Sequence, residues 1–328
     1  MLRLPPFAYW SPRSLTEAAQ MMAAHGPDAM YVAGGTDLYP NMKRRQFEPK
    51  HLIGLRRVPE LNEFSAEHGR GFRIGAGLTL TQVASHPLIR QVHPALATAA
   101  ALVSTPQLRN MGTYGGNLCL DTRCNYYNQS YFWRKSIGFC MKKDGDICLV
   151  APGSSRCWAV SSTDTAPGTI ALDASVRLVG PQGERVVPAR ALYRDDGMEY
   201  LAKAPDEILT EVIIPPAKGL RSVYLKLRRR GSFDFPILGV AVALRQDGDG
   251  TVRHARVVLG GVQSYPMECD DAEKMLLGQR LTPELIDAVA QAAYKPAKPL
   301  DNTDMAHGYR KKMSKIYVER ALRTFLTQ

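Results

Sequence analysis

The sequence lacks a long hydrophobic run, a low-complexity segment and the common nucleotide-binding motifs. Its first residues, MLRLPPFAYWSPRSLTEAAQ, contain two prolines and no apolar run of even ten residues. Such a start is typical of neither a signal peptide nor a membrane anchor, so we expect a cytoplasmic protein with no membrane partner. Because no segment is biased in composition, a disordered scaffold is also excluded.

Acidic residues are fewer than basic ones, with 31 Asp and Glu against 42 Lys and Arg, which leaves a net charge of +11. Basic surfaces that bind nucleic acid interleave these charges with aromatic side chains for base stacking. The basic runs here, Lys43–Arg45, Arg228–Arg230 and Lys311–Lys315, contain no such aromatics. We therefore expect no nucleic-acid partner, and a diffuse basic surface that could steer an acidic protein or an anionic substrate.

The length of the chain predicts more than one domain. With 328 residues, of which 45% are hydrophobic, it exceeds the size at which one core usually stops growing. Strand-like runs alternate with helices and glycine turns up to residue 216, and strands followed by helices occupy residues 217–328. This pattern predicts an α+β fold with a boundary near residue 217, rather than a regular doubly wound sheet.

Several helices can be placed from capping residues and apolar spacing. A helix is predicted over residues 14–25, where Ser14 can cap the first turn and Glu17 follows three positions later, as in a capping box. A longer helix is predicted over HPALATAAALVSTPQLRNM, which ends before Gly112. The remaining predictions are a β-hairpin around residues 180–183 and helices over residues 270–278, 282–293 and 304–327.

Two turns carry paired glycines, AGGTDL at residues 33–38 and GTYGGN at residues 112–117. Paired glycines let backbone N–H groups converge and let a ligand approach without obstruction by a Cβ atom, which is how chains bind pyrophosphate. Neither turn fits GxGxxG or the Walker motif, and a single Gly-Gly pair is more often only a turn. Taken one at a time, the turns leave both interpretations open.

Together with their flanks, the two turns resemble a known family. The strings YVAGGTDLYPNMK and LRNMGTYGGNL, and the later STDTAP, resemble the flavin-contacting segments of the medium, FAD-binding subunit of molybdenum hydroxylases. That family includes carbon monoxide dehydrogenase, xanthine dehydrogenase and 4-hydroxybenzoyl-CoA reductase. The resemblance extends over nearly the whole chain, through EILTEVIIP, YLKLRRRGSFDFPILGVAVAL and GGVQSYP.

The resemblance implies a two-lobed FAD-binding domain of the PCMH or vanillyl-alcohol-oxidase type over residues 1–216, with lobes of about 1–57 and 58–216. A smaller α+β domain, like the C-terminal domain of the CO dehydrogenase flavoprotein, is implied over residues 217–328. FAD would lie in the groove between the lobes. The residues that match positions around the diphosphate are Val32, Ala33, Gly34, Gly35, Thr36 and Asp37, then Thr113, Gly115, Gly116 and Asn117.

The resemblance also implies that Asp164, Leu209 and Lys226 lie beside the ribityl chain or the isoalloxazine ring. The residue types suit these roles, because a carboxylate can accept a hydrogen bond from a ribityl hydroxyl and a lysine can stabilise negative charge on a reduced flavin. Without the resemblance, a helix-capping aspartate and a surface lysine would be the preferred interpretations of Asp164 and Lys226.

Five of the six cysteines lie between Cys119 and Cys157. In relatives, an Asp-x-x-Pro segment follows the GGN turn closely, whereas an insertion of about residues 120–160 intervenes here. Cys124, Cys140, Cys148 and Cys157 give the spacing C-x15-C-x7-C-x8-C, and four thiolates can hold a [4Fe-4S] cluster or a structural zinc ion. Zinc sites usually contain closely spaced pairs such as CxxC, so their absence favours the cluster.

Among the medium subunits of this family, an extra loop with a [4Fe-4S] cluster is typical of the beta subunit of 4-hydroxybenzoyl-CoA reductase. The cysteine spacing here resembles that of this loop. Cys119 is expected to pack beside the flavin turn and Cys269 to be a buried free thiol. The aromatic side chains of the insertion could shield a cluster from water, or could form only the small core that an inserted loop needs. They are Tyr126, Tyr127, Tyr131, Phe132, Trp133, Phe139 and Trp158.

The implied function is a redox relay in anaerobic aromatic catabolism. Ferredoxin would supply electrons, and these would pass to [2Fe-2S] clusters on a small subunit and a molybdenum cofactor on a large subunit, in a dimer of heterotrimers. The absence of a catalytic triad or an HExxH motif suits such a relay subunit. Two alternatives stay open: a related medium subunit that passes electrons outward from a hydroxylated substrate, and a zinc-stabilised interaction protein without FAD.

Overall fold

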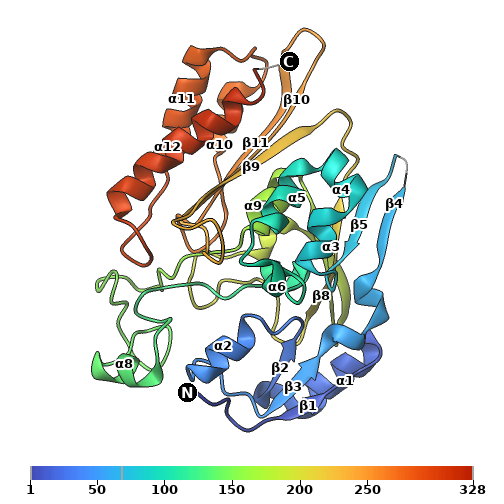
Figure 1. The fold of residues 1–328 in the computed structure, drawn as a ribbon, viewed down its shortest axis with the longest axis vertical. Helices are drawn as coiled ribbons and strands as arrows, with labels where there is room; N and C mark the ends of the chain where they lie inside the picture. The colour runs from blue at the N-terminus through green and yellow to red at the C-terminus, as the bar shows by residue number, and fades with distance from the viewer. Residues whose placement is uncertain (1, 68, 327–328) are drawn as a thin grey trace.

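The computed structural model describes residues 2–67 and 69–326, and three β-sheets with helices around them form the chain (Figure 1). The first is a parallel sheet of order β1-β3-β2. Apolar side chains of α1 pack on one side of it, and those of α2 on the other. Its elements are β1 (Ala8–Trp10), α1 (Leu15–His25), β2 (Ala29–Val32), α2 (Leu38–Lys43) and β3 (His51–Gly54).

The predicted helix over residues 14–25 is confirmed, and its start is capped as expected. The Ser14 hydroxyl accepts a hydrogen bond from the Glu17 backbone N–H at 3.1 Å. The Glu17 carboxylate, however, accepts from the backbone N–H of Arg13 at 2.6 Å, one residue before the position that a capping box requires. Next along the chain come a strand, a glycine turn, a short helix and another strand. They are β2, residues 33–37, α2 and β3.

The second sheet has five antiparallel strands in the order β4-β5-β8-β6-β7, and the predicted hairpin around residues 180–183 is its β6–β7 pair. Its strands are β4 (Phe64–Glu67), β5 (Gly71–Gly75), β6 (Ser175–Gly180), β7 (Gly183–Pro188) and β8 (Ile208–Ile214). The helices in this region are α3 (Leu80–Ser85), α4 (Pro87–Val92), α5 (Pro94–Ala101), α6 (Pro106–Arg109), α7 (Tyr114–Leu118) and α9 (Thr165–Ala171). Short 3₁₀ helices cover Gly26–Asp28, Leu55–Arg57, Pro59–Asn62 and Ala189–Leu192.

The prediction of one long helix before Gly112 is wrong, because the chain forms α5 and α6 with a break between them. Pro106 disfavours helical backbone at the residue before it, and Thr105 is extended and caps α6 through its hydroxyl. Ser104 takes a left-handed φ of 43° in the same break. The break directs residues 103–112 toward the first glycine turn.

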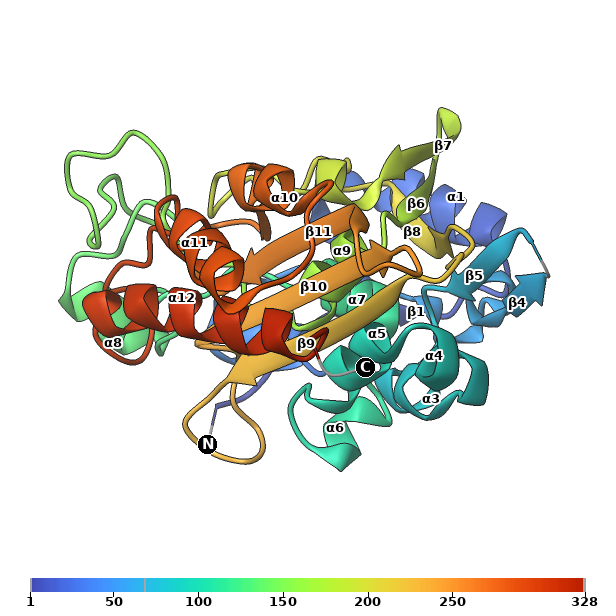
Figure 2. The same cartoon turned by 90° about the horizontal axis from the view of Figure 1, so that it is seen from above.

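The third sheet is antiparallel, of order β12-β11-β10-β9, and helices cover both of its faces (Figure 2). Side chains of α5 and α9 pack on one face together with the five-stranded sheet, and α10, α11 and α12 pack on the other. This explains the continuously buried run LGVAVAL in β10. The elements are β9 (Arg221–Leu227), β10 (Leu238–Gln246), β11 (Val252–Gly260), β12 (Met267–Glu268), α10 (Asp270–Leu276), α11 (Pro283–Tyr294) and α12 (His307–Arg323).

The insertion of about residues 120–160 leaves the body of the protein as a largely irregular segment with one helix, α8 (Tyr131–Ser136), in the described chain (Figure 1). The two ends of this insertion lie side by side. Arg123 and Val160 form an isolated antiparallel bridge, with N···O distances of 2.8 Å and 2.7 Å. The buried Arg134 side chain of α8 donates to the carbonyl oxygens of Arg44 and Arg45, which attaches the insertion to the end of α2.

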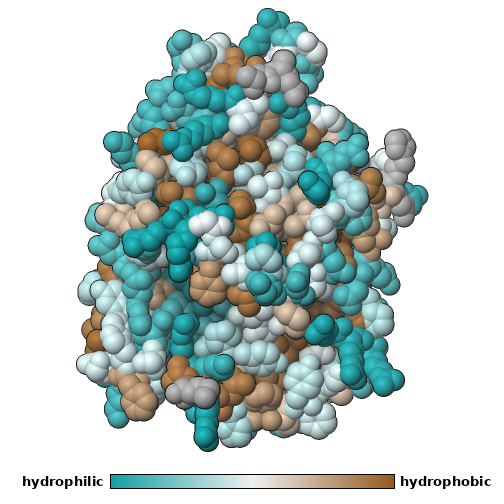
Figure 3. Space-filling model, viewed as in Figure 1, coloured by the Kyte–Doolittle hydropathy of each residue, from teal (hydrophilic) through white to brown (hydrophobic). Residues whose placement is uncertain are grey.

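The predicted α+β class is confirmed by these mixed sheets and helices. Hydrophilic and hydrophobic residues are interspersed over the face shown in Figure 3. Within residues 2–67 and 69–326, none of the helices has both the length and the apolar character needed to cross a membrane.

Candidate functional site

A cavity of about 1030 Å³ lies where strands of the first two sheets meet the loop that follows β9. Its walls come from the end of β2, both glycine turns, the start of β8, the loop that follows β9 and the first residues of the insertion. Sites for large organic cofactors are concave and reach this size. Of the flavin-contacting residues expected from the sequence, all but Lys226 line it: Val32, Ala33, Gly34, Gly35, Thr36, Asp37, Thr113, Gly115, Gly116, Asn117, Asp164 and Leu209.

The two glycine turns touch each other. A Cβ atom on Gly34 would overlap the carbonyl oxygen of Met111 and lie 2.8 Å from the Cα atom of Gly112. Gly35 has a φ of +70°, a conformation that L side chains rarely adopt. Both glycines are therefore required by the backbone itself, and the contact makes one continuous wall from segments far apart in the sequence.

The first turn presents backbone donors to this wall. Among the described residues, none accepts a hydrogen bond from the backbone N–H groups of Gly34, Gly35 or Thr36. These three residues are half-buried and line the cavity, and converging N–H groups form concave sites for anions. The donors and the missing Cβ atoms together fit a diphosphate.

The second turn is fixed from two sides. The Thr113 hydroxyl accepts from the Gly116 backbone N–H at 3.1 Å, and Gly115 approaches so closely that a Cβ atom on it would lie 2.6 Å from the Cβ atom of Ala76. The Asn117 side-chain oxygen accepts hydrogen bonds from the Thr163 hydroxyl at 2.9 Å and the Thr165 hydroxyl at 2.7 Å. Asn117 therefore joins the second turn to the STDTAP segment.

Asp164 is buried at the cavity wall and holds an ion pair behind it. Its carboxylate accepts hydrogen bonds from the Tyr224 hydroxyl at 2.9 Å and the Lys226 ammonium at 2.9 Å. Burial raises the pKa of Asp164 to about 6, although the charge of Lys226 acts in the opposite direction. Lys226 also donates to the carbonyl oxygens of Leu102 and Asp234, so it lies behind Asp164 rather than in the cavity wall.

Arg123 is a site residue that the sequence analysis did not identify. Its guanidinium forms an ion pair with Asp37 of the first glycine turn and lies 4.6 Å from the centroid of the Phe235 ring. The Arg123 side chain is only 9% exposed and the Asp37 side chain is 30% exposed, so this pair is partly shielded from solvent at one side of the cavity. The partners are far apart in the chain, and no local pattern indicates the contact.

Three of the four cysteines of the insertion pack together in its interior. Cys124, Cys140 and Cys157 belong to one buried cluster with Tyr127, and Cys148 is buried outside this cluster. All four are buried and free of disulfides, and Cys124 also lines the cavity. Burial raises the pKa of the Cys124 thiol to about 12. Within the described ranges, no group of three or more His, Cys, Asp or Glu side chains is arranged to hold a metal ion.

The remaining cysteines lie apart from this set. Cys119 lines the cavity at the end of the second glycine turn, where the sequence predicts packing beside the flavin turn. Cys269 is buried in the core between the third sheet and its helices, as expected for a free thiol. Neither belongs to the buried cysteine cluster of the insertion.

Asn302, before α12, holds both ends of the cysteine insertion. Its carbonyl oxygen accepts from the backbone N–H of Asn125 at 2.8 Å, and its side-chain nitrogen donates to the carbonyl oxygen of Trp158 at 2.6 Å. The buried Arg310 guanidinium donates to the Asn302 side-chain oxygen at 3.3 Å. Since Asn125 and Trp158 are the neighbours of Cys124 and Cys157, this contact fixes the backbone that carries two of the thiols.

The comparisons with known proteins agree with this architecture. Residues 5–217 match the family model described as the FAD binding domain in molybdopterin dehydrogenase, and residues 222–325 match the CO dehydrogenase flavoprotein C-terminal domain. The carbon monoxide dehydrogenase medium chain of Hydrogenophaga pseudoflava is 32% identical, over 97% of this chain and 96% of its own. The aldehyde oxidoreductase FAD-binding subunit PaoB of Escherichia coli is also 32% identical, over 82% and 86%.

A solved structure of carbon monoxide dehydrogenase from Hydrogenophaga pseudoflava matches with a TM-score of 0.80 and 30% identity, over 98% of this chain and 97% of that one. The predicted fold, an FAD-binding domain followed by a CO dehydrogenase flavoprotein C-terminal-like domain, is thereby confirmed. The chain belongs to the medium, FAD-binding subunits of the molybdenum hydroxylase family and is an oxidoreductase subunit.

Proposed function

We propose that the chain is the FAD and [4Fe-4S] electron-transfer subunit of a molybdenum-containing 4-hydroxybenzoyl-CoA reductase in the cytoplasm. The observation that carries this proposal is the set of four buried thiols in an insertion whose first cysteine, Cys124, also lines the cavity. Such an insertion gives the subunit a second candidate site for an electron carrier beside the flavin site. Bound FAD and a bound cluster would supply the electron transfer itself.

The cavity residues fit FAD in this proposal. Residues 32–37 of the first turn and Thr113, Gly115, Gly116 and Asn117 of the second would surround the diphosphate, with the free N–H groups of Gly34 and Gly35 as donors. Asp164 and Leu209 would contact the ribityl chain or the ring. Lys226 would act through Asp164, because its ammonium orients that carboxylate from behind.

The cysteines fit a cluster better than a zinc ion. A structural zinc ion needs four ligands at about 2.0–2.3 Å from one point. A [4Fe-4S] cluster bonds each thiolate to a different iron atom, so its ligands lie farther apart. All four thiols are buried, three of them in one cluster, without closely spaced pairs in the sequence, and their apolar surroundings would exclude water from an iron-sulfur cluster. The zinc-stabilised interaction protein is therefore the weaker alternative.

In the proposed holoenzyme, ferredoxin supplies electrons and the partner subunits carry the [2Fe-2S] clusters and the molybdenum cofactor. The large molybdenum subunit would remove the phenolic hydroxyl of 4-hydroxybenzoyl-CoA to give benzoyl-CoA, a step of anaerobic aromatic catabolism. This chain would contribute no catalytic group to that step. A dimer of heterotrimers is the proposed assembly.

A second candidate is a medium subunit that passes electrons outward from an oxidised substrate. The names of several relatives favour it, because they are dehydrogenases of carbon monoxide and nicotinate and an oxidoreductase of aldehydes. In that case the cysteine insertion would lead electrons out toward an acceptor. The identity of the electron partner and the substrate separates the two candidates.

The experiment that tests the proposal is a visible spectrum with iron, sulfide, zinc and flavin analysis of the full chain, purified without oxygen. About one FAD with four iron and four sulfide per chain is expected. Cys140→Ser should lower the iron content at least twofold and leave FAD bound. Cys269→Ser is the matched control, because it alters a buried thiol outside the insertion and should retain all iron.

FAD with one zinc or no metal would overturn the cluster assignment and leave a flavoprotein subunit. A chain with no flavin would overturn the FAD assignment. Turnover of 4-hydroxybenzoyl-CoA with reduced ferredoxin by the assembled enzyme then distinguishes the reductase from the outward-transferring candidate.

A further inference from the structure

The first glycine turn carries a negative charge beside its free backbone N–H groups. Asp37 follows directly after Thr36, lines the cavity with the rest of the turn, and has a side chain that is 30% exposed. A diphosphate is itself an anion, and like charges repel more strongly where water is partly excluded. An unpaired Asp37 carboxylate would therefore weaken the binding of a diphosphate at this turn.

Arg123 and Asn41 hold this carboxylate in place. Arg123 forms the ion pair with Asp37, and the Asn41 side-chain nitrogen donates to Asp37 Oδ2 at 3.1 Å. Arg123 also donates to Asn41 Oδ1 at 3.3 Å, so each of the three side chains contacts the other two. In the part of the chain that the structure describes, Asp37 is the only acidic partner of Arg123. The positive charge is thus committed to this one carboxylate.

The backbone fixes both charges before a ligand enters. Arg123 pairs with Val160 at the base of the insertion through two hydrogen bonds, of 2.8 Å and 2.7 Å. Asp37 directly precedes α2, the helix that carries Asn41. Because these segments are already ordered, little further entropy is lost when the side chains are held in one geometry. The ion pair is therefore part of the folded wall.

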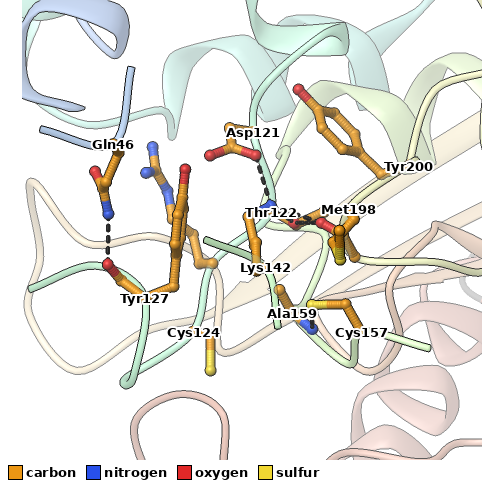
Figure 4. Close-up of polar contacts among 12 residues, drawn as sticks. Gln46, Asp121, Thr122, Cys124, Tyr127, Lys142, Cys157, Ala159, Met198 and Tyr200 are labelled. Atoms are coloured by element: carbon orange, nitrogen blue, oxygen red, sulfur yellow. Dashed lines mark hydrogen bonds and ion pairs between the residues drawn. The ribbon is translucent and has the colours of Figure 1, made fainter. Parts of the chain in front are cut away.

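The other acidic residues of the cavity wall are neutralised in the same way. The Lys142 ammonium, for example, donates to Asp121 Oδ1 at 2.8 Å, and both side chains are only 6% exposed (Figure 4). Each acidic residue that lines the cavity in the described chain forms an ion pair with a lysine or an arginine. The pairs are Asp37–Arg123, Asp121–Lys142, Asp164–Lys226, Glu207–Arg185 and Asp234–Arg230.

Three basic residues of the same wall form no ion pair within residues 2–67 and 69–326. They are Arg44, Arg56 and Lys203. The wall therefore has a positive balance, and a concave surface with such a balance attracts an anionic ligand. At the first glycine turn, this balance depends on the pairing of Asp37.

We propose that Arg123 is a positioning residue for FAD: it neutralises Asp37, so that the first glycine turn can accept the diphosphate. The inference rests on the proposed function in one respect, the location of the FAD diphosphate at the two glycine turns. It requires none of the four cysteines. Because Arg123 stands at the base of the insertion, this segment supplies part of the flavin site.

The test is a fluorescence titration of the flavin-free full chain with FAD. Arg123→Gln leaves Asp37 unpaired, so the Kd for FAD should rise about tenfold or more. Asp37→Asn frees the guanidinium to attract the diphosphate, so the Kd should fall about threefold or more. The double variant removes both charges, and its Kd should return to within about threefold of the wild-type value.

Arg45→Gln is the matched control, because Arg45 also forms an ion pair, with Glu48, but does not line the cavity. Its Kd for FAD should equal that of the wild type. Riboflavin lacks the diphosphate, so its Kd should be the same in the wild type and in Arg123→Gln. A loss of riboflavin affinity as large as the loss of FAD affinity would mean that the cavity has collapsed, and would overturn the inference.

A double variant that binds FAD as weakly as Arg123→Gln would also overturn it, because the loss would then not come from the charge of Asp37. If Arg123→Gln does not fold, Asp37→Asn decides, and an FAD affinity no higher than that of the wild type overturns the inference. A wild-type chain that binds no FAD overturns the FAD assignment and this inference together. Wild-type binding with unchanged affinity in both single variants overturns the inference alone.

Discussion

Gly34 is the residue at which the two glycine turns meet, so its replacement tests the cavity directly. In Gly34→Ala, the new Cβ atom would overlap the Met111 carbonyl oxygen, and the turns must separate. We expect FAD affinity to fall at least tenfold, measured by fluorescence titration of the flavin-free chain with FAD. Gly153→Ala is the control, because a Cβ atom there has no neighbour within 4 Å. Unchanged affinity in Gly34→Ala would show that the wall does not bind FAD.

His93 gives a second prediction at the scale of single residues, on how the free energy of unfolding depends on pH. Its ring is 1% exposed, both ring nitrogens lack a partner among the described residues, and it packs edge-on against Phe72 at 4.8 Å. Burial lowers the pKa of His93 from about 6.5 to about 4. Between these values the unfolded chain binds a proton at His93 that the folded chain does not. The contribution of neutral His93 to the free energy of unfolding is therefore fully present above pH 6.5 and is lost as the pH falls toward 4.

The unfolding free energy should therefore decrease by about 2 kcal/mol between pH 7 and pH 5 through His93 alone. Asp164 acts in the opposite direction in part of this range, because its pKa is raised and the folded chain then binds the extra proton. The difference between the wild type and His93→Leu isolates the histidine. Urea denaturation at both pH values measures it, and a pH-independent difference would contradict the prediction.

At the site, the sequence indicated the cavity-lining residues well because glycine turns and their flanks are local patterns. Lys226 lies behind Asp164, whereas the resemblance implied a position beside the flavin. A lysine in a strand gives no sign of which buried carboxylate it will contact. Arg123 was missed for the same reason, because its partner Asp37 is brought to it only by the tertiary fold. Charge pairs between distant segments were the unpredictable part of the site.

Among the elements, those with a cap or a clear period were predicted and those without one were not. The helix that starts after Ser14 and the hairpin of β6 and β7 follow from local residues. The break between α5 and α6 was missed although Pro106 indicates it, because the run of alanines before it favours a helix. The contacts of the insertion depend on residues far away in the chain and have no local pattern.

Asn302 gives a prediction at the scale of this inserted segment. Asn302→Ala removes the hydrogen bonds to Trp158 and from Arg310, and a lost buried hydrogen bond costs about 1–3 kcal/mol. Local opening of the insertion should become at least fivefold more frequent. Limited trypsin digestion followed by mass spectrometry should show faster cleavage at Lys142 and Lys143.

The control for this experiment is Thr303→Ala, since Thr303 contributes its backbone oxygen to Asn125 rather than its side chain. Cleavage at the wild-type rate in Asn302→Ala would mean that the insertion is held independently of Asn302. Faster cleavage throughout the chain would instead indicate global destabilisation.

Across the whole molecule, strands of two sheets and the loop that follows β9 line the cavity, so a ligand that fills it should stabilise these parts together. At a hundredfold excess over its Kd, FAD should add about 2.7 kcal/mol to the stability of the flavin-free chain and raise its Tm by several degrees. Differential scanning fluorimetry without bound flavin measures this. Riboflavin lacks the diphosphate and should have a smaller effect, and equal stabilisation by both would contradict the role of the glycine turns.

The α+β class was predictable because strand-like and helix-like runs could be told apart by their period. The packing of α5 and α9 between two sheets was not, because it depends on which apolar faces meet after folding. The residue limits of the two lobes stay predictions. The sequence thus predicts the individual helices and strands, and only the structure shows which distant elements pack together.

The bridge between Arg123 and Val160 has a consequence for the loop that it closes. Two residues that pair through both backbone hydrogen bonds already form the base of a hairpin, and a hairpin base can be closed by a turn of two residues. Residues 124–159 thus form a long loop, which a short turn could replace without moving Arg123 or Val160. A chain in which a two-residue turn replaces residues 124–159 should therefore keep both glycine turns in place.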